Sequence, residues 1–258
     1  MTESEADQKN LRKNNGNYQL IHHLQQMGIT QYSGVNGGGV IHITKYLAPN
    51  NLLEETNPST PKLLTLSEYT SGFMPLGYYL ASGKIAGAIS TTGAAIKLSS
   101  CGLSDAKLHN IPALYLVALN SLTSIGKSPL QDVSVHGMNI TPQLTAELGK
   151  GCIIIDNIKK LSSELTRAYA MLQHHHPVVI AFHPDILSET VSTEKQVTYS
   201  KQQPSPAANI DFFITDLLKT HKNKRIILYV GEEAAPYPDI KNLTTQLAIQ
   251  LHAPTVGL

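Results

Sequence analysis

The chain has 258 residues, of which 41% are hydrophobic and 15% are charged, so it can bury a full core in one large or two modest domains. A formal net charge of +1 gives no reason to expect nucleic acid or an anionic membrane surface as a partner. The longest apolar run, 113–119, is too short to span a bilayer, and the polar residues 1–16 contain no apolar signal segment. We expect a cytoplasmic protein with a flexible leader at 1–16.

The cysteines and the clustered histidines do not predict a metal site. Cys101 and Cys152 lack the spacing of metal ligands, and we expect both to be buried, reduced thiols. His22 and His23 are consecutive, as are the three histidines at 174–176. Consecutive residues of a helix point in different directions, so these groups are expected to be solvated or to interact with helix ends. We predict no metal ligand in this chain.

The first predicted elements are a helix, a strand and a second helix. Apolar residues at helical spacing predict a helix over 18–27, which is followed by a strand at 29–35. The run Asn36-Gly37-Gly38-Gly39 then leads into a helix that begins at Val40. A glycine run before a helix is compatible with a phosphate site. Its spacing is not that of the dinucleotide motif G-x-G-x-x-G, so nucleotide binding is disfavoured.

The central stretch, 63–106, predicts a strand, a helix, a second strand, a glycine turn and a second helix. Glu68 lies in the first turn of the first helix, and Thr92 and Gly93 lie in the turn after the second strand. Parallel strands that deliver loops to the same edge of a sheet create a ligand site there. By spacing alone, Glu68 is an ordinary acidic residue that complements the helix dipole.

The later part of the chain continues the alternation of strands and helices. Strands are predicted at 111–119, 151–155 and 178–182, with helices from 140 and over 161–173. This order predicts an α/β fold, a doubly wound, mostly parallel six-stranded sheet with helices on both faces. Residues 188–222 are expected to form a linker with a short helix, and 223–258 a strand, a helix and a strand.

The order of these segments resembles the pyrimidine-binding domain of thiamine-diphosphate enzymes, in the group of acetolactate synthase, pyruvate oxidase and benzoylformate decarboxylase. The residues that carry the resemblance are Glu68, a glycine-bearing helix, S-G-K at 82–84, T-T-G at 91–93 and G-L-S-D-A at 102–106. The resemblance extends over residues 17–187. It resumes at 224, where 223–258 would begin the central domain of the family.

The resemblance also implies a set of site residues. In the family, a glutamate in the place of Glu68 contacts N1′ of the cofactor's aminopyrimidine and shares a proton with it, which makes Glu68 the implied catalytic residue. The implied cofactor-binding residues are Asn36, Gly37, Glu68, Thr92 and Gly93, and the implied substrate-facing residues are Gly38 and Gln131. Asn36 stands where the family usually has a proline. For Gln131, a polar loop residue before a helix is an equally good interpretation.

One part of the family's site is absent from the sequence. The family binds the diphosphate group and its magnesium ion through a G-D-G motif in a separate domain, and this chain contains no G-D-G. The resemblance therefore implies that the diphosphate-binding domain of a partner subunit completes the site, in a homodimer or larger assembly. We expect an inactive half of a lyase or carboligase that acts on 2-oxo acids, in a chain that is truncated or needs a partner. The alternative is a non-catalytic relative that retains the fold for subunit association.

Overall fold

The computed structural model describes residues 14–50, 57–191, 199, 210–220, 224–231, 234 and 239–257. The chain divides into two compact units, residues 1–201 and 202–258. Residues 1–13 of the expected leader and most of the expected linker at 188–222 lie outside the described residues.

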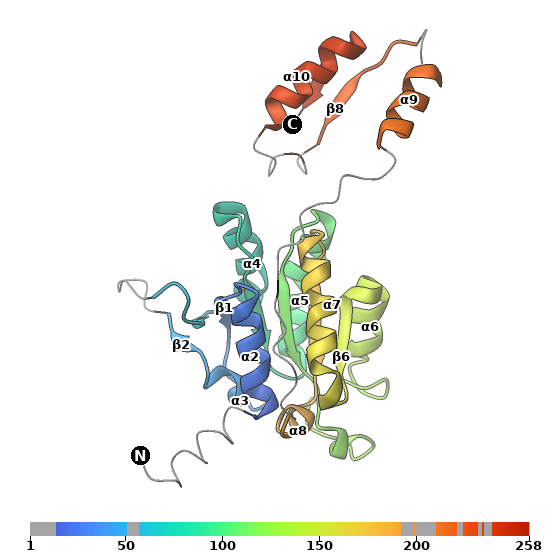
Figure 1. Ribbon diagram of the computed structural model, residues 1–258. Coiled ribbons are helices and arrows are strands. Elements are labelled where there is room, and N and C mark those ends of the chain that lie inside the picture. Colours follow the sequence, from blue (N-terminus) through green and yellow to red (C-terminus); the bar gives the residue numbers. More distant parts are fainter. Residues whose placement is uncertain are drawn as a thin grey trace. The chain divides into compact units, whose positions relative to one another are not determined.

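The first unit contains a seven-stranded, all-parallel sheet with the order β2-β3-β1-β4-β5-β7-β6 (Figure 1). Its strands are β1 (Gln31–Gly34), β2 (Ala48–Pro49), β3 (Lys62–Thr65), β4 (Gly87–Ser90), β5 (Leu114–Ala118), β6 (Cys152–Ile155) and β7 (Val178–Phe182). The predicted α/β class is confirmed, but the predicted count of six strands is wrong. The additional strand is β2, which has two residues and lies at the edge, where Pro49 is tolerated without an amide hydrogen.

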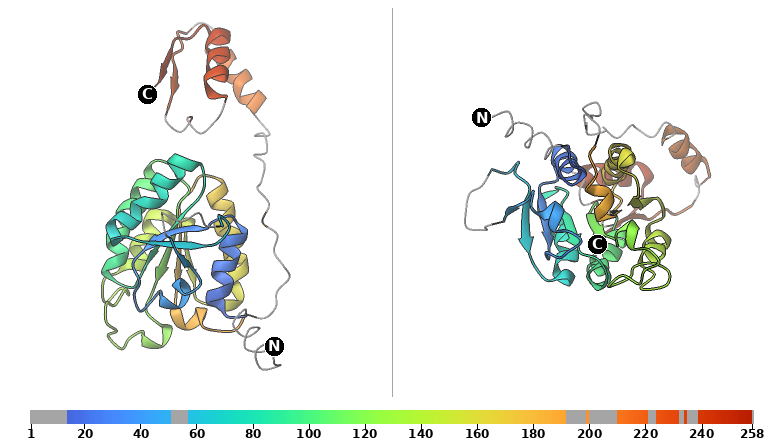
Figure 2. Two further views of the ribbon diagram at one scale, coloured as in Figure 1. Left: turned by 90° about the vertical axis from the view of Figure 1, so that its left-hand side faces the viewer. Right: turned by 90° about the horizontal axis from the view of Figure 1, so that it is seen from below.

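Helices cover both faces of this sheet (Figure 2). The helices whose side chains join the first core cluster are α2 (Gly16–Gln26), α3 (Ile41–Thr44), α7 (Leu161–Gln173) and α8 (Pro184–Leu187). Those that join the second are α4 (Glu68–Ser82), α5 (Ala94–Leu108) and α6 (Ile140–Leu148). The described part of this unit also contains three short 3-10 turns, η1 (Leu122–Ser124), η2 (Gly149–Gly151) and η3 (Ile158–Lys160).

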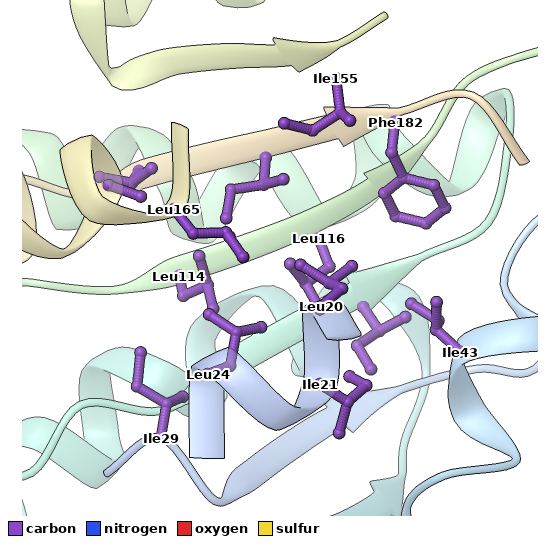
Figure 3. Close-up of a cluster of buried hydrophobic side chains, with 14 of the residues drawn as sticks. Leu20, Ile21, Leu24, Ile29, Ile43, Leu114, Leu116, Ile155, Leu165 and Phe182 are labelled. Carbon is purple, nitrogen blue, oxygen red and sulfur yellow. The ribbon is translucent and has the colours of Figure 1, made fainter. Parts of the chain in front are cut away.

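Strand β5 shows how the two cores share the sheet. Leu114 and Leu116 project into the first core, between the strands and helices α2 and α7 (Figure 3), whereas Tyr115 and Val117 project into the second. Successive side chains of a strand point to opposite faces, so a central strand of a doubly covered sheet must be apolar throughout. This explains the uninterrupted apolar run at 111–119.

The second unit contains α9 (Ile210–Thr220), β8 (Leu228–Val230), α10 (Ile240–Leu251) and β9 (Thr255–Gly257). Strands β8 and β9 pair in parallel and form a two-stranded sheet. Large apolar side chains of this unit are exposed, and Tyr229, Ile249 and Val256 are each at least half accessible to solvent. In the part of the chain that the structure describes, no helix is long and apolar enough to cross a membrane.

Both cysteines are free thiols, but only one is even partly buried. Cys152 is half-buried at the start of β6. Cys101 is exposed, against the expectation from the sequence. The buried positions of α5 include Ser99, Gly102 and Leu103, so Cys101 lies outside the helix face that packs on the sheet.

Candidate functional site

The candidate site lies at the carboxyl ends of three neighbouring strands, β3, β1 and β4 (Figure 1). The loop after β1 leads to α3 on one face of the sheet, whereas the loop after β4 leads to α5 on the other. Loops that diverge in this way mark a topological switch point, which is where open parallel sheets bind ligands. Two contacts join the three strand ends, since Leu66 N–H donates to Gly34 O at 3.3 Å and Gly39 N–H donates to Thr91 Oγ1 at 3.2 Å.

Glu68 is the first residue of α4, directly after β3. Ser67 is the N-cap, and its Oγ accepts a hydrogen bond from the Thr70 amide at 3.3 Å. The cap therefore satisfies a free amide of the first turn without using Glu68. Glu68 is half-buried, and within the described ranges no hydrogen bond or ion pair reaches its carboxylate. The group is available to a ligand.

Buried hydroxyl groups fix the first turns of α4 to the sheet. Ser33 Oγ of β1 donates to Ser71 O at 2.9 Å, and Tyr115 Oη of β5 donates to Gly72 O at 2.9 Å. Burial, and to a lesser extent the charge of Asp105, raises the pKa of Tyr115, so this phenol stays protonated and donates at neutral pH. The helix that carries Glu68 is thus held at two successive carbonyl groups.

The glycine run after β1 packs against the loop after β4. A Cβ atom on Gly37 would lie 2.5 Å from Thr91 Oγ1, and one on Gly39 would lie 2.7 Å from Thr92 Oγ1. These two positions therefore require glycine for packing. Gly38 is exposed and has no atom within 4 Å of an added Cβ, and Asn36 is also exposed. Of the predicted site residues in this loop, Gly37 thus packs against Thr91, whereas Asn36 and Gly38 are exposed.

The turn after β4 meets the loop after β5. Thr92 Oγ1 donates to Leu119 O at 3.4 Å. Gly93 has a φ of 91°, and a Cβ on it would lie 2.5 Å from Cβ of Gln131. Gln131 is exposed and itself has a positive φ of 55°. The structure therefore brings Gly93 and Gln131, which are distant in the sequence, into direct contact.

The roles of these residues are not equally visible in the sequence. The local pattern places Glu68 and Gly93 correctly at the start of a helix and in a turn. It gives no sign of the contacts of Ser33 or Tyr115, which lie at buried positions of strands β1 and β5 and donate hydrogen bonds to carbonyl groups of helix α4. In the residues that the structure describes, no three His, Cys, Asp or Glu side chains gather as a metal ion would require.

A protein-family model described as "Thiamine pyrophosphate enzyme, N-terminal TPP binding domain" matches residues 14–139. Residues 14–139 therefore resemble the N-terminal domain of this family. All seven implied site residues lie inside the matched segment, and the resemblance inferred from the sequence is confirmed. Thiamine pyrophosphate, that is thiamine diphosphate, is the cofactor of the family.

Two curated relatives of this thiamine pyrophosphate enzyme domain are acetolactate synthases. The chain is 22% identical over 214 residues to the acetolactate synthase isozyme 1 large subunit of Escherichia coli (strain K12), a match that covers 82% of this chain and 36% of that protein. It is 24% identical over 125 residues to an acetolactate synthase of Mycobacterium avium, which covers 48% of this chain and 19% of that protein. The chain thus matches little more than a third of the first relative's length.

Proposed function

We propose that this chain supplies the pyrimidine-binding half of a thiamine-diphosphate-dependent active site that acts on 2-oxo acids, in the manner of an acetolactate synthase. The observation that carries the proposal is the Glu68 carboxylate, half-buried at the switch point of the sheet and without a partner among the described residues. A general acid or base must be free to reach the proton that it moves. Because Ser67 caps the helix, Glu68 is free to do so.

The residues at this edge fit the pyrimidine end of the cofactor. We assign to Glu68 the contact with the ring nitrogen N1′, where it would hold or release one proton. Gly37, Thr92 and Gly93, with Asn36 at the rim, would bind and orient the ring, and Gly38 and Gln131 would face the substrate. The bound cofactor supplies a nucleophilic carbon and an electron sink for bond changes next to a carbonyl group. The protein's task is to bind it, orient it and move the proton.

The diphosphate end requires other residues. Because the chain contains no G-D-G motif, we assign the diphosphate group and its magnesium ion to the diphosphate-binding domain of a partner subunit, in a homodimer or larger assembly. In this proposal residues 17–187 are the pyrimidine-binding domain and 223–258 begin a central domain. Thiamine diphosphate with magnesium should then bind the 258-residue chain weakly in calorimetry, and tight metal-dependent binding would contradict this division.

The test of the catalytic role is the Glu68→Gln variant of the assembled protein. Glutamine is nearly isosteric with glutamate, so the fold should persist while proton transfer is lost. Proton-deuterium exchange at C2 of bound thiamine diphosphate should slow by about 100- to 10,000-fold. The matched control is Glu147→Gln in α6, whose Oε1 accepts a hydrogen bond from Ser104 and which should exchange at the normal rate. An unchanged rate in Glu68→Gln would favour the alternative of a non-catalytic relative retained for subunit association.

A further inference from the structure

Helix α4 contains a proline in its interior, Pro75, yet it continues to Ser82. Proline has no amide hydrogen, so the carbonyl group four residues earlier loses its helical donor. That carbonyl belongs to Ser71, which is 1% exposed. A buried carbonyl without a donor is costly, because water cannot reach it either.

The missing donor comes from a different element. Ser33 Oγ, on the neighbouring strand β1, donates to Ser71 O at 2.9 Å, and Ser33 is 0% exposed. The hydroxyl of Ser33 thus takes the place of the amide hydrogen that Pro75 lacks. The next carbonyl, Gly72 O, accepts a hydrogen bond from Tyr115, but there the residue four positions on, Leu76, has an amide hydrogen of its own.

Ser71 links this hydrogen bond to the candidate site. Its amide donates to Ser67 O at 2.8 Å, and its Oγ donates to Leu66 O at 3.3 Å, so it closes the first turn of α4 onto the end of β3. Glu68 lies in the turn between Ser67 and Ser71. The placement of this turn relative to β1 therefore depends on Ser33.

We propose that Ser33 is a positioning residue for Glu68, which acts through the Ser71 carbonyl that Pro75 leaves without a helical donor. The inference rests on the proposed role of Glu68. It adds that the site depends on a buried pair, Ser33 and Pro75, in which Pro75 makes the hydroxyl group of Ser33 necessary.

A double-mutant cycle on the 258-residue chain tests the hydrogen bond without any cofactor. Ser33→Ala should lower the folding equilibrium constant by about 5- to 150-fold, the size expected for leaving a buried carbonyl unpaired. In the Pro75→Ala background the helix regains an amide donor for Ser71 O, so Ser33→Ala should there have an effect of less than about 5-fold. Tyr115→Phe is the control, because its effect should not change with Pro75→Ala. Additive effects of Ser33→Ala and Pro75→Ala would overturn the proposal.

The positioning role has two further readouts. The NMR shift of the Glu68 carboxyl carbon in the chain alone should move in Ser33→Ala and return towards its original value in the double variant. In the assembled protein, C2 exchange should slow by about 10-fold or more in Ser33→Ala, and Pro75→Ala should restore it. A normal exchange rate in Ser33→Ala beside a slow one in Glu68→Gln overturns the positioning role alone. A normal rate in Glu68→Gln overturns the proposed function and the positioning role with it.

Discussion

Gly72 of α4 and Gly102 of α5 face each other where the two helices cross, and neither position has room for a methyl group. A Cβ on Gly102 would lie closest to the Gly72 carbonyl and 2.7 Å from the Phe73 amide nitrogen. A Cβ on Gly72 would lie 2.9 Å from the Ser99 carbonyl carbon. The helices therefore approach backbone to backbone, which only glycine permits. This crossing sets the distance between helix α4, which carries Glu68, and helix α5.

Gly102→Ala and Gly72→Ala should each lower the free energy of unfolding by about 1–3 kcal/mol, because the added methyl group forces the helices apart. Urea denaturation of the chain measures the effect. The control is Gly77→Ala in the same helix, where the site is exposed and an added Cβ meets nothing within 4 Å. That variant should be stabilised by up to about 1 kcal/mol, since alanine has the higher helix propensity. Equal stability of Gly77→Ala and Gly102→Ala would contradict the interpretation.

Gly93→Ala should destabilise the chain for two reasons. The backbone angles of Gly93, φ 91° and ψ −131°, are strained for any residue with a side chain, at a cost of about 1–3 kcal/mol. The added methyl group would also collide with Gln131. Adding Gln131→Ala should relieve the collision but leave the strain, so the double variant should recover only part of the lost unfolding free energy. Gly38→Ala, at an open position of the same edge, should be close to neutral, and a loss as large as that of Gly93→Ala would be evidence against this account.

His23 should make the stability of the first unit depend on pH. Its Nδ1 is hydrogen-bonded to the Tyr199 hydroxyl at 2.9 Å, so of the two alternatives expected for it, solvation does not hold, whereas its place in the last turn of α2 agrees with the expected position at a helix end. Burial, and then the nearby His22, lower the pKa of His23 below its ordinary value of 6.5. The other groups around this contact are Tyr169, whose ring packs on Tyr199, and the hydroxyl of Thr166, which hydrogen-bonds to it.

The sign of the effect follows from the lowered pKa of His23. Above pH 6.5 the imidazole is neutral in both states, and below it the unfolded chain binds a proton more readily than the folded chain. The free energy of unfolding should therefore fall as the pH drops from about 6.5 towards the folded pKa. His23→Gln keeps an acceptor for Tyr199 and should lose this part of the dependence. Urea denaturation of the parent chain and of His23→Gln between about pH 5 and 7.5 measures the difference. The same dependence of the free energy of unfolding on pH in both chains would disprove the prediction.

The two thiols should react at different rates in the folded chain. Cys101 is exposed, whereas burial raises the pKa of the half-buried Cys152 and lowers its thiolate fraction. A thiol reagent at pH 8 should therefore label Cys101 quickly and Cys152 slowly. Cys101→Ser should remove the fast phase and Cys152→Ser the slow one. A single rate for both thiols in the parent chain would show that Cys152 is more accessible than the structure indicates.

The sequence predicts the fold best where one element is long and regular. Helix α7 and strand β7 have the predicted bounds, Leu161–Gln173 and Val178–Phe182, because a helical apolar face and a fully apolar strand are both visible locally. Strand β2 was not predictable, since two residues, Ala48 and Pro49, are too few to show any periodicity. Its place follows from pairing with β3, which is a property of the folded sheet.

The candidate site was predictable in its parts but not in its contacts. The junction at Ser67-Glu68 identifies a helix start from local residues alone. The contacts between Gly37 and Thr91 and between Gly93 and Gln131 depend on which strands are neighbours. A sequence of alternating strands and helices is compatible with several strand orders, so the sequence alone does not show which strands are neighbours. The same holds for Pro75. Its position in the sequence shows that the carbonyl group four residues earlier lacks a helical donor, but it does not identify Ser33 as the residue that donates instead.

The parallel sheet also limits how early in synthesis each strand can meet its partner. No two neighbouring strands are joined by a hairpin, and β1 pairs with β3 and β4, both of which are made after it. Strand β6 pairs with β7, its one neighbour in the sheet, so it waits for residue 182 before it has a complete partner. Until β7 has been made, β6 and one edge of the apolar strand β5 therefore lack their partner. Such non-local pairing makes folding slow and exposes intermediates to aggregation, which makes chaperone dependence and low-temperature expression practical concerns for this protein.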